Sequence, residues 1–255
     1  MNRVIVAFCF ICMSFYLYSC TTGRESAEQG RYEYDRILIE RLNHHNGRIH
    51  TVDARALVVF READRNFSFR ATLSVENHGE NLRLDLSDFV FKKPLLSIVK
   101  NGEQVTTILY TKRSYFEMPY EQLDMKKISG LNIRKEILLS ALMGKVYIEE
   151  QNSVTSSPEP HLLIIENSYM KETISFNDQL LPVSVFYDFQ NDVYTMTFRE
   201  YIRIGDLVFP KKVTVRNQDR VLEANYSDVS VNQPLDPEIF HVSEEDIGGF
   251  ERKNL

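Results

Sequence analysis

Apolar and polar residues alternate along most of the chain after residue 53, which is the pattern of strands that bury one face. The clearest example is a hairpin in which Phe67 to Val75 and Leu82 to Leu86 flank a polar turn at residues 76–81. Comparable segments, including Lys145 to Glu150, follow at short intervals and are joined by turn residues. The pattern predicts about eleven strands, mostly paired with their neighbours in sequence as antiparallel hairpins.

Two segments follow the spacing of a helix instead. In Tyr32 to Asn46 the apolar residues share one face, and Gly47 suits the end of the helix. Within residues 122–144 a second apolar face ends at Gly144, and a shorter helical turn precedes it. Ile133, Ile137, Leu138, Ala141 and Leu142 make up this second face. The sequence therefore predicts an α+β, β-dominated domain, in which one wide curved sheet wraps over an N-terminal helix and one or two mid-chain helices.

The N-terminus has the features of a secretion signal. Val4 to Tyr18 is largely apolar, follows Arg3, and is too short to span a membrane comfortably. Leu17-Tyr18-Ser19-Cys20 resembles the bacterial lipobox, so residues 1–19 are interpreted as a lipoprotein signal peptide and Cys20 as the acylated first residue of the mature protein. Each methylene buried in a bilayer contributes about 0.8 kcal/mol, so several acyl chains on Cys20 would anchor the protein stably. An uncleaved anchor and an ordinary signal peptide are the alternatives.

Composition narrows the function classes. The net charge of -6 argues against a broad nucleic-acid surface, so we expect no nucleic-acid partner. Cys9, Cys12 and Cys20 are the three cysteines, and only Cys20 would remain after cleavage, so no disulfide and no cysteine metal site is expected. The polar segment 20–30 would serve as a tether from the membrane to the folded domain.

Motifs for catalysis are missing from the sequence. No G-x-G phosphate loop, no G-x-S-x-G nucleophile turn and no H-E-x-x-H zinc motif occurs. His44, His45 and His50 lie close together, but cationic histidines suit a solvated helix end better than a metal site. We therefore expect no enzyme activity, no cofactor and no metal. Lys92-Lys93, Lys126-Lys127 and Lys211-Lys212 are candidates for contact with anionic lipid head groups, or simply solvated surface.

The order of elements resembles the outer-membrane lipoprotein receptor LolB and its relatives, including the periplasmic carrier LolA. The resemblance covers residues 31–242 and leaves 243–255 as a tail that we expect to be frayed. It is carried by Lys93-Pro94-Leu95, by Leu180 to Tyr187, by Phe198-Arg199-Glu200-Tyr201 before Gly205 to Val213, by Pro234 to Phe240, and by the lipobox. The resemblance implies an unclosed half-barrel whose helices cover a cavity for lipoprotein acyl chains.

The candidate cavity residues are the apolar positions of the alternating strands. They are Phe67, Phe69, Leu73, Leu82, Leu84, Leu86, Val183, Val185, Tyr187, Met196 and Phe198. The resemblance implies a protein anchored through Cys20 in the outer membrane, facing the periplasm, that binds lipid or lipoprotein acyl chains. Two alternatives stay open: a packed core without a cavity, and an envelope assembly or scaffold lipoprotein that binds a protein partner along its sheet edges. LolB-like receptors also carry an exposed apolar residue on a protruding loop, and the turn at 76–81 has none.

Overall fold

A computed structural model describes residues 33–63, 65–76, 79–129, 133–148, 153–155, 157, 159–189, 192–218 and 220–253. The predicted signal peptide, Cys20 and the tether at residues 20–30 lie outside the described residues.

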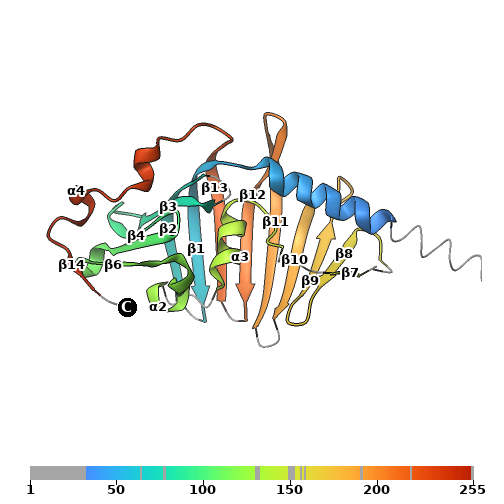
Figure 1. Ribbon diagram of the computed structural model, residues 1–255, viewed down its shortest axis with the longest axis horizontal. Helices are drawn as coiled ribbons and strands as arrows, with labels where there is room; N and C mark the ends of the chain where they lie inside the picture. Colours follow the sequence, from blue (N-terminus) through green and yellow to red (C-terminus); the bar gives the residue numbers. More distant parts are fainter. Residues whose placement is uncertain are drawn as a thin grey trace, which may run out of the picture.

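One sheet of fourteen strands, β1 to β14, forms the body of the protein (Figure 1). Its order is β14-β6-β5-β4-β3-β2-β1-β13-β12-β11-β10-β9-β8-β7, and all neighbours are antiparallel except β14 and β6. The strands are Val52–Glu62, Arg65–Glu76, Asn81–Asp88, Pro94–Asn101, Gln104–Leu109, Ser114–Pro119, Ser153–Thr155, Leu162–Glu166, Lys171–Phe176, Pro182–Phe189, Asp192–Ile204, Leu207–Asn217, Arg220–Val231 and Glu251–Arg252. In the described part of the chain the outermost strands β14 and β7 do not pair with each other, so the sheet is an unclosed half-barrel, as predicted.

The N-terminal helix and the two mid-chain helices lie on one face of this sheet, which we call the inner face (Figure 1). The N-terminal helix (33–48) crosses one half, while α2 (Met125–Ser129) and α3 (Lys135–Leu142) belong to the other half and the centre. Short 3-10 turns are η2 (Tyr110–Lys112), η3 (Tyr120–Gln122) and η4 (Pro237–Phe240), and α4 spans Glu244–Ile247. None of the helices in the described ranges has both the length and the hydropathy that crossing a bilayer requires.

The lid helix α3 buries the predicted apolar face. Ile137, Leu138 and Leu142 are all buried. At its C-terminal end, the hydroxyl of Tyr226 donates a hydrogen bond to the carbonyl of Leu142 at 2.7 Å. Gly144 follows with φ +68°, and a Cβ there would lie 2.8 Å from the ring of Phe209. The chain therefore needs glycine at this position to leave the helix against β12 and β13.

The segment predicted as a strand at Lys145 to Glu150 is not a strand at residues 145–148, and 149–150 lie outside the described residues. Its backbone is satisfied by a side chain from the N-terminal helix. Asn46 Nδ2 donates to the carbonyl of Val146 at 2.8 Å, and the Val146 N–H donates to Asn46 Oδ1 at 3.2 Å. These two bonds replace strand pairing and dock the N-terminal helix on the segment that leaves α3.

Four strands were not predicted: β1, β6, β7 and β14. β1 contains the unbroken apolar run Ala56 to Phe60, which hides the alternation that its burial pattern shows. β7 and β14 are only three and two residues long and exist through pairing with β8 and β6. With the strand at 145–150 removed, these additions raise the predicted number to fourteen.

The C-terminal tail is ordered through residue 253, which corrects the expectation of fraying. We call residues 232–253 the C-terminal strap. Ser243 and Asp246 form a capping box that begins α4, and Phe250 packs edge-on against Tyr110 with ring centroids 5.7 Å apart. Arg83 on β3 donates to the carbonyl of Ile239 and pairs with Asp246. Because Arg83 alternates with the inward-facing leucines of β3, the strap covers the outer face of the sheet and leaves the inner face free.

Candidate functional site

The inner face of β1 to β5 contains an apolar hollow. Its volume is about 380 Å³. The lining is apolar except for Glu62, and consists of Val58, Phe60, Glu62, Phe67, Phe69, Leu86, Leu95, Leu96, Leu109 and Leu222. These residues come from β1 to β5 and β13, at the end of the molecule where β1 turns into β2. A concave apolar surface of this size is the ordinary form of a site for an apolar ligand.

Aromatic side chains form the open side of the hollow. The rings of Phe60 and Phe67 stack with centroids 6.3 Å apart, and those of Phe67 and Phe69 at 6.4 Å. Phe67 is nevertheless 42% exposed, so the stack presents an apolar surface to the surroundings. Each square ångström of apolar surface that stays in water costs about 25 cal/mol relative to burying it. An arrangement of this kind points to an apolar occupant.

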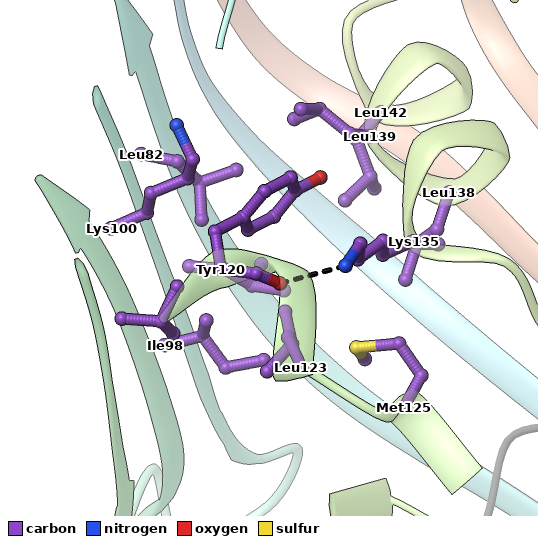
Figure 2. Close-up of a pocket in the computed structure, with 12 residues that line it drawn as sticks. Leu82, Ile98, Lys100, Tyr120, Leu123, Met125, Lys135, Leu138, Leu139 and Leu142 are labelled. Atoms are coloured by element: carbon purple, nitrogen blue, oxygen red, sulfur yellow. Dashed lines mark hydrogen bonds between the residues drawn. The ribbon is translucent and has the colours of Figure 1, made fainter. Parts of the chain in front are cut away.

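A second hollow on the same face is filled by the protein itself. We call it the lid pocket. It lies between Leu82, Leu84 and Ile98 of the sheet and the leucines of α3, and its free volume is only about 40 Å³ (Figure 2). The register places Leu84 opposite Ile98 and Leu86 opposite Leu96, so the two hollows occupy consecutive rows of the same strands. The leucines of α3 line the lid pocket, and none of them lines the apolar hollow.

Two lysines lie against the ring of Tyr120 beside the lid helix (Figure 2). Lys135 Nζ of α3 donates to the carbonyls of Tyr120 at 2.7 Å and Glu121 at 2.8 Å. Lys100 Nζ of β4 donates to the carbonyls of Gly79 and Glu80 at 2.8 and 2.7 Å. The two ammonium groups lie 4.6 and 4.8 Å from the centroid of the Tyr120 ring, so each gains a cation–π contact. Burial raises the pKa of Tyr120 to about 12 and lowers the pKa of Lys100.

The structure distributes the predicted cavity residues over three places. Phe67, Phe69 and Leu86 line the apolar hollow, and Leu82 and Leu84 line the lid pocket. The others, except Val183, are buried in the packed core: Leu73, Val185, Tyr187, Met196 and Phe198.

Within the buried group, Leu73, Val185, Tyr187 and Met196 line neither the apolar hollow nor the lid pocket. Tyr187 and Met196 are fully buried, and the Tyr187 hydroxyl donates to the carbonyl of Tyr147 at 3.1 Å. The N-terminal helix crosses this half of the sheet (Figure 1), and its Leu38 and Leu42 are buried in the same core. Val183 lies at a bulge of β10 between Pro182 and Ser184, and together with Phe198 it lines a further open hollow of about 540 Å³ whose lining is half polar. These residues are therefore not part of the candidate site.

An exposed apolar loop at the β3–β4 turn was not predicted. Phe89, Val90 and Phe91 are 43, 70 and 75% exposed. The loop is nevertheless held in shape, because Asp88 Oδ1 accepts hydrogen bonds from the backbone N–H groups of Val90 and Phe91 at 2.9 and 2.6 Å. Arg70 donates from Nε to the carbonyl of Phe89 at 3.1 Å and lies 5.2 Å from its ring centroid.

The sequence signal for this loop was three consecutive apolar residues directly before Lys92-Lys93-Pro94. Turns are ordinarily polar, so such a run between two strands is informative. The apolar tip absent from the turn at 76–81 thus occurs at the opposite end of β3, beside the mouth of the apolar hollow.

Across the described ranges, no group of three or more His, Cys, Asp or Glu side chains is arranged to hold a metal ion. His45 lies 3.4 Å from the carbonyl of Gly144 through Nε2, and burial lowers its pKa.

Comparisons with solved structures agree on the fold. A domain assigned to outer-membrane lipoprotein sorting from Vibrio parahaemolyticus superposes with a TM-score of 0.60 at 10% identity, covering 82% of this chain and 97% of that one. A LolA superfamily protein from Nitrosomonas europaea has a TM-score of 0.55 at 11% identity, covering 82% and 98%. A DUF1329 family protein from Desulfovibrio piger has a TM-score of 0.54 at 9% identity, covering 84% and 96%.

No protein-family model and no curated protein matches the chain in sequence. The likeness is thus one of fold, since the superpositions cover 82% of this chain at 10 and 11% sequence identity. The chain has the LolA/LolB-like half-barrel fold.

Proposed function

We propose that this protein is a membrane-anchored, non-enzymatic lipoprotein that binds acyl chains in the apolar hollow and acts in lipid or lipoprotein localisation at the outer membrane. The observation that carries the proposal is the hollow of about 380 Å³ on the inner face of the half-barrel. Transfer of an acyl chain needs apolar surface and no covalent chemistry, which agrees with the absence of catalytic motifs from the sequence.

The energetics support an occupied hollow. Well-packed interiors contain few voids larger than a water molecule. Removing apolar surface from water contributes about 25 cal/mol per Å², so a chain that covers the exposed part of Phe67 and its neighbours binds favourably. In the lid pocket on the adjacent row, the protein itself covers the apolar surface, because the leucines of α3 fill the space above the strands.

The exposed loop supports a role at a membrane surface. Phe89, Val90 and Phe91 lie at the same end of the strands as the mouth of the hollow, and Lys92 and Lys93 follow them. Aromatic residues favour the boundary between head groups and acyl chains, and lysines near that boundary attract anionic lipids. The loop would bring the hollow to the bilayer from which a chain is taken or to which it is delivered. Acylation of Cys20 and residence in the outer membrane are predictions from the sequence and complete this picture.

A fluorescent fatty-acid titration tests the proposal on the chain that begins at residue 21. The buried apolar core extends from Leu38 to Phe240, so this chain keeps the complete core. The wild type is expected to bind the probe saturably. Leu86→Trp places a larger side chain in the hollow and is expected to weaken binding at least tenfold.

Leu57→Trp is the matched control, because Leu57 belongs to the outer-facing row of β1 and contributes nothing to the hollow. Equal binding by wild type and Leu86→Trp, with both proteins folded, would reject the hollow as the acyl site. Absence of probe binding together with capture of an envelope protein would favour the scaffold alternative.

A further inference from the structure

We propose that Asp88 is a positioning residue that holds Val90 and Phe91 as a preformed tip for insertion into a lipid bilayer, while Arg70 holds Phe89 against the sheet. This inference rests on the membrane contact in the proposed function and names the residues that prepare the loop for it.

The backbone of Asp88 closes the β3–β4 loop. Its N–H donates to the carbonyl of Lys93 at 2.8 Å, and its carbonyl accepts from the N–H of Lys92 at 3.1 Å. Lys92 has φ +57°, a left-handed conformation that is unfavourable for a residue with a Cβ. A strained residue of this kind persists only where the surrounding bonds determine the path of the chain, and the two bonds of Asp88 do so here.

The carboxylate of Asp88 fixes the part of the loop that projects. Its Oδ1 accepts from the N–H of Val90 at 2.9 Å and from the N–H of Phe91 at 2.6 Å. An Asp side chain that accepts from the backbone further along the chain forms an Asx turn, and its negative charge strengthens the bonds. Val90 and Phe91 are the most exposed of the large apolar residues that the structure describes. The loop is thus held in the one shape that keeps both side chains in water.

Phe89 has a different role from the two tip residues. Arg70 donates from Nε to the carbonyl of Phe89 at 3.1 Å, and its guanidinium lies 5.2 Å from the centroid of the Phe89 ring. Arg70 is paired in register with Leu57, which belongs to the outer-facing row of β1. This contact therefore attaches the base of the loop to the outer face of the sheet, and Phe89 is less exposed than the tip.

A lipid bilayer is the occupant that suits so small a tip. Two side chains supply far less than the area of about 800 Å² that each partner contributes to a standard protein interface. A bilayer needs no such area, because apolar side chains enter below the head groups one by one and the long side chains of Lys92 and Lys93 can stay at head-group level. The proposal relies on this apolar contact and not on charge, because Asp88 offsets one of the two lysines.

A preformed tip matters because ordering a mobile loop opposes binding. Fixing free backbone costs conformational entropy, and a loop that already has its bound shape avoids that cost. The β9–β10 turn shows the same device without an apolar tip. There Asn177 Oδ1 accepts from the N–H groups of Gln179 and Leu181 at 3.0 Å each, and the exposed residues are Asp178 and Gln179. This turn provides a matched control.

A pair of substitutions at one position tests the positioning role. The parent is the chain that begins at residue 21 with Phe91→Trp as reporter, since the sequence contains no tryptophan. Its emission shifts to the blue in a bilayer, so titration with phosphatidylcholine vesicles gives the partition coefficient. Asp88→Ala is expected to weaken partition about tenfold, which corresponds to about 1.4 kcal/mol and is of the order of fixing the backbone of one residue. Asp88→Asn removes the same charge but keeps an oxygen acceptor, and is expected to stay within twofold of the parent.

Tryptophan anisotropy without vesicles reports the motion of the loop itself. It is expected to fall in Asp88→Ala and to keep the parent value in Asp88→Asn. Asn177→Ala should change neither the anisotropy nor the partition coefficient. Unchanged urea midpoints and unchanged fatty-acid binding in all three variants would show that the sheet and the apolar hollow are intact.

The outcomes separate this inference from the proposed function. Equal partition coefficients for Asp88→Ala and Asp88→Asn, whether both high or both low, would overturn the positioning role of the carboxylate oxygen. The membrane contact would still stand if the parent partitions into the vesicles. A parent that does not partition would overturn both, while acyl-chain binding is decided by the fatty-acid titration alone.

The separate roles of Phe89 and Phe91 have a test of their own. In the chain without the reporter, Phe91→Ser is expected to reduce co-sedimentation with phosphatidylcholine vesicles more than Phe89→Ser does, because only Phe91 belongs to the projecting tip. An equal or larger loss in Phe89→Ser would contradict the attachment of Phe89 to the sheet through Arg70.

Discussion

Replacement of Lys135 by methionine is expected to loosen the lid helix without unfolding the sheet. Lys135 Nζ joins α3 to the carbonyls of Tyr120 and Glu121 and lies 4.6 Å from the Tyr120 ring centroid. Methionine keeps a flexible apolar stem of similar length and removes the charged group. The variant therefore tests the polar attachment of α3 separately from its leucine packing.

The magnitude follows from these contacts. A hydrogen bond from a charged donor contributes about 1.5–3 kcal/mol, and an exposed cation–π contact about 0.5–1 kcal/mol. Glu121 lies at the surface, so in the variant water takes the place of the lysine as hydrogen-bond donor to its carbonyl. We therefore expect the free energy that favours the closed lid to fall by about 2 kcal/mol in total. That loss corresponds to a factor of about 30 in the equilibrium between closed and open lid. Leu138 and Leu142 stay buried at 6 and 7% exposure and keep the closed state predominant.

Amide hydrogen exchange measures this equilibrium directly. Peptides that contain residues 133–142 should exchange about 30-fold faster in Lys135→Met, while peptides of β1 and β13 should keep the wild-type rate. Lys126→Met on α2 is the control, because Lys126 is exposed and only its backbone N–H has a bond to Asp124. Unchanged exchange in α3 would show that leucine packing alone holds the lid. Faster exchange throughout the sheet would show that Lys135 supports the whole fold.

Three further predictions concern stability and membrane contact. Gly144→Ala should lower the free energy of unfolding in urea by about 1–3 kcal/mol, because φ is +68° and the new Cβ would lie 2.8 Å from the ring of Phe209; an unchanged midpoint would contradict the tight exit from α3. Burial lowers the pKa of His45 from 6.5, so below that pH the unfolded state takes up a proton before the folded state does and the free energy of unfolding falls. His45→Gln should reduce this fall in the free energy of unfolding, and His44→Gln, at an exposed position, should not; an unchanged fall in His45→Gln would exclude His45 as its source. Replacing Phe89, Val90 and Phe91 by serine should reduce co-sedimentation with anionic vesicles at least tenfold, since each side chain buried in the bilayer contributes about 1.5–3 kcal/mol, while fatty-acid binding persists. Undiminished sedimentation would remove the loop from the membrane contact.

Local patterns predicted the elements that depend on local physics. The alternation in Phe67 to Val75 and Leu82 to Leu86 predicted a hairpin, and the structure pairs Leu73 with Leu84 in register. The apolar face predicted for the second helix is buried in α3. In each case a two-residue or helical period places one set of side chains on one face, whatever the rest of the chain does.

The predicted strand at Lys145 to Glu150 failed for a non-local reason. Its composition suits a strand, but Asn46, which is 100 residues away in sequence, takes up the backbone groups of Val146. No pattern within 145–150 contains that information. The short strands β7 and β14 are the converse, since only their pairing partners make them strands.

The sequence by itself determined the β-dominated class, the helices that cover the sheet and which residues lie on its inner face, because these follow from the period of apolar positions. Only the tertiary structure decided where that face is hollow. Phe69 and Tyr187 occupy equivalent places in alternating strands, yet Phe69 lines the apolar hollow and Tyr187 is fully buried in the half of the sheet that the N-terminal helix covers. Whether an apolar row is covered depends on which distant segment packs against it, and that choice is made by the packing of the whole chain rather than by the row itself.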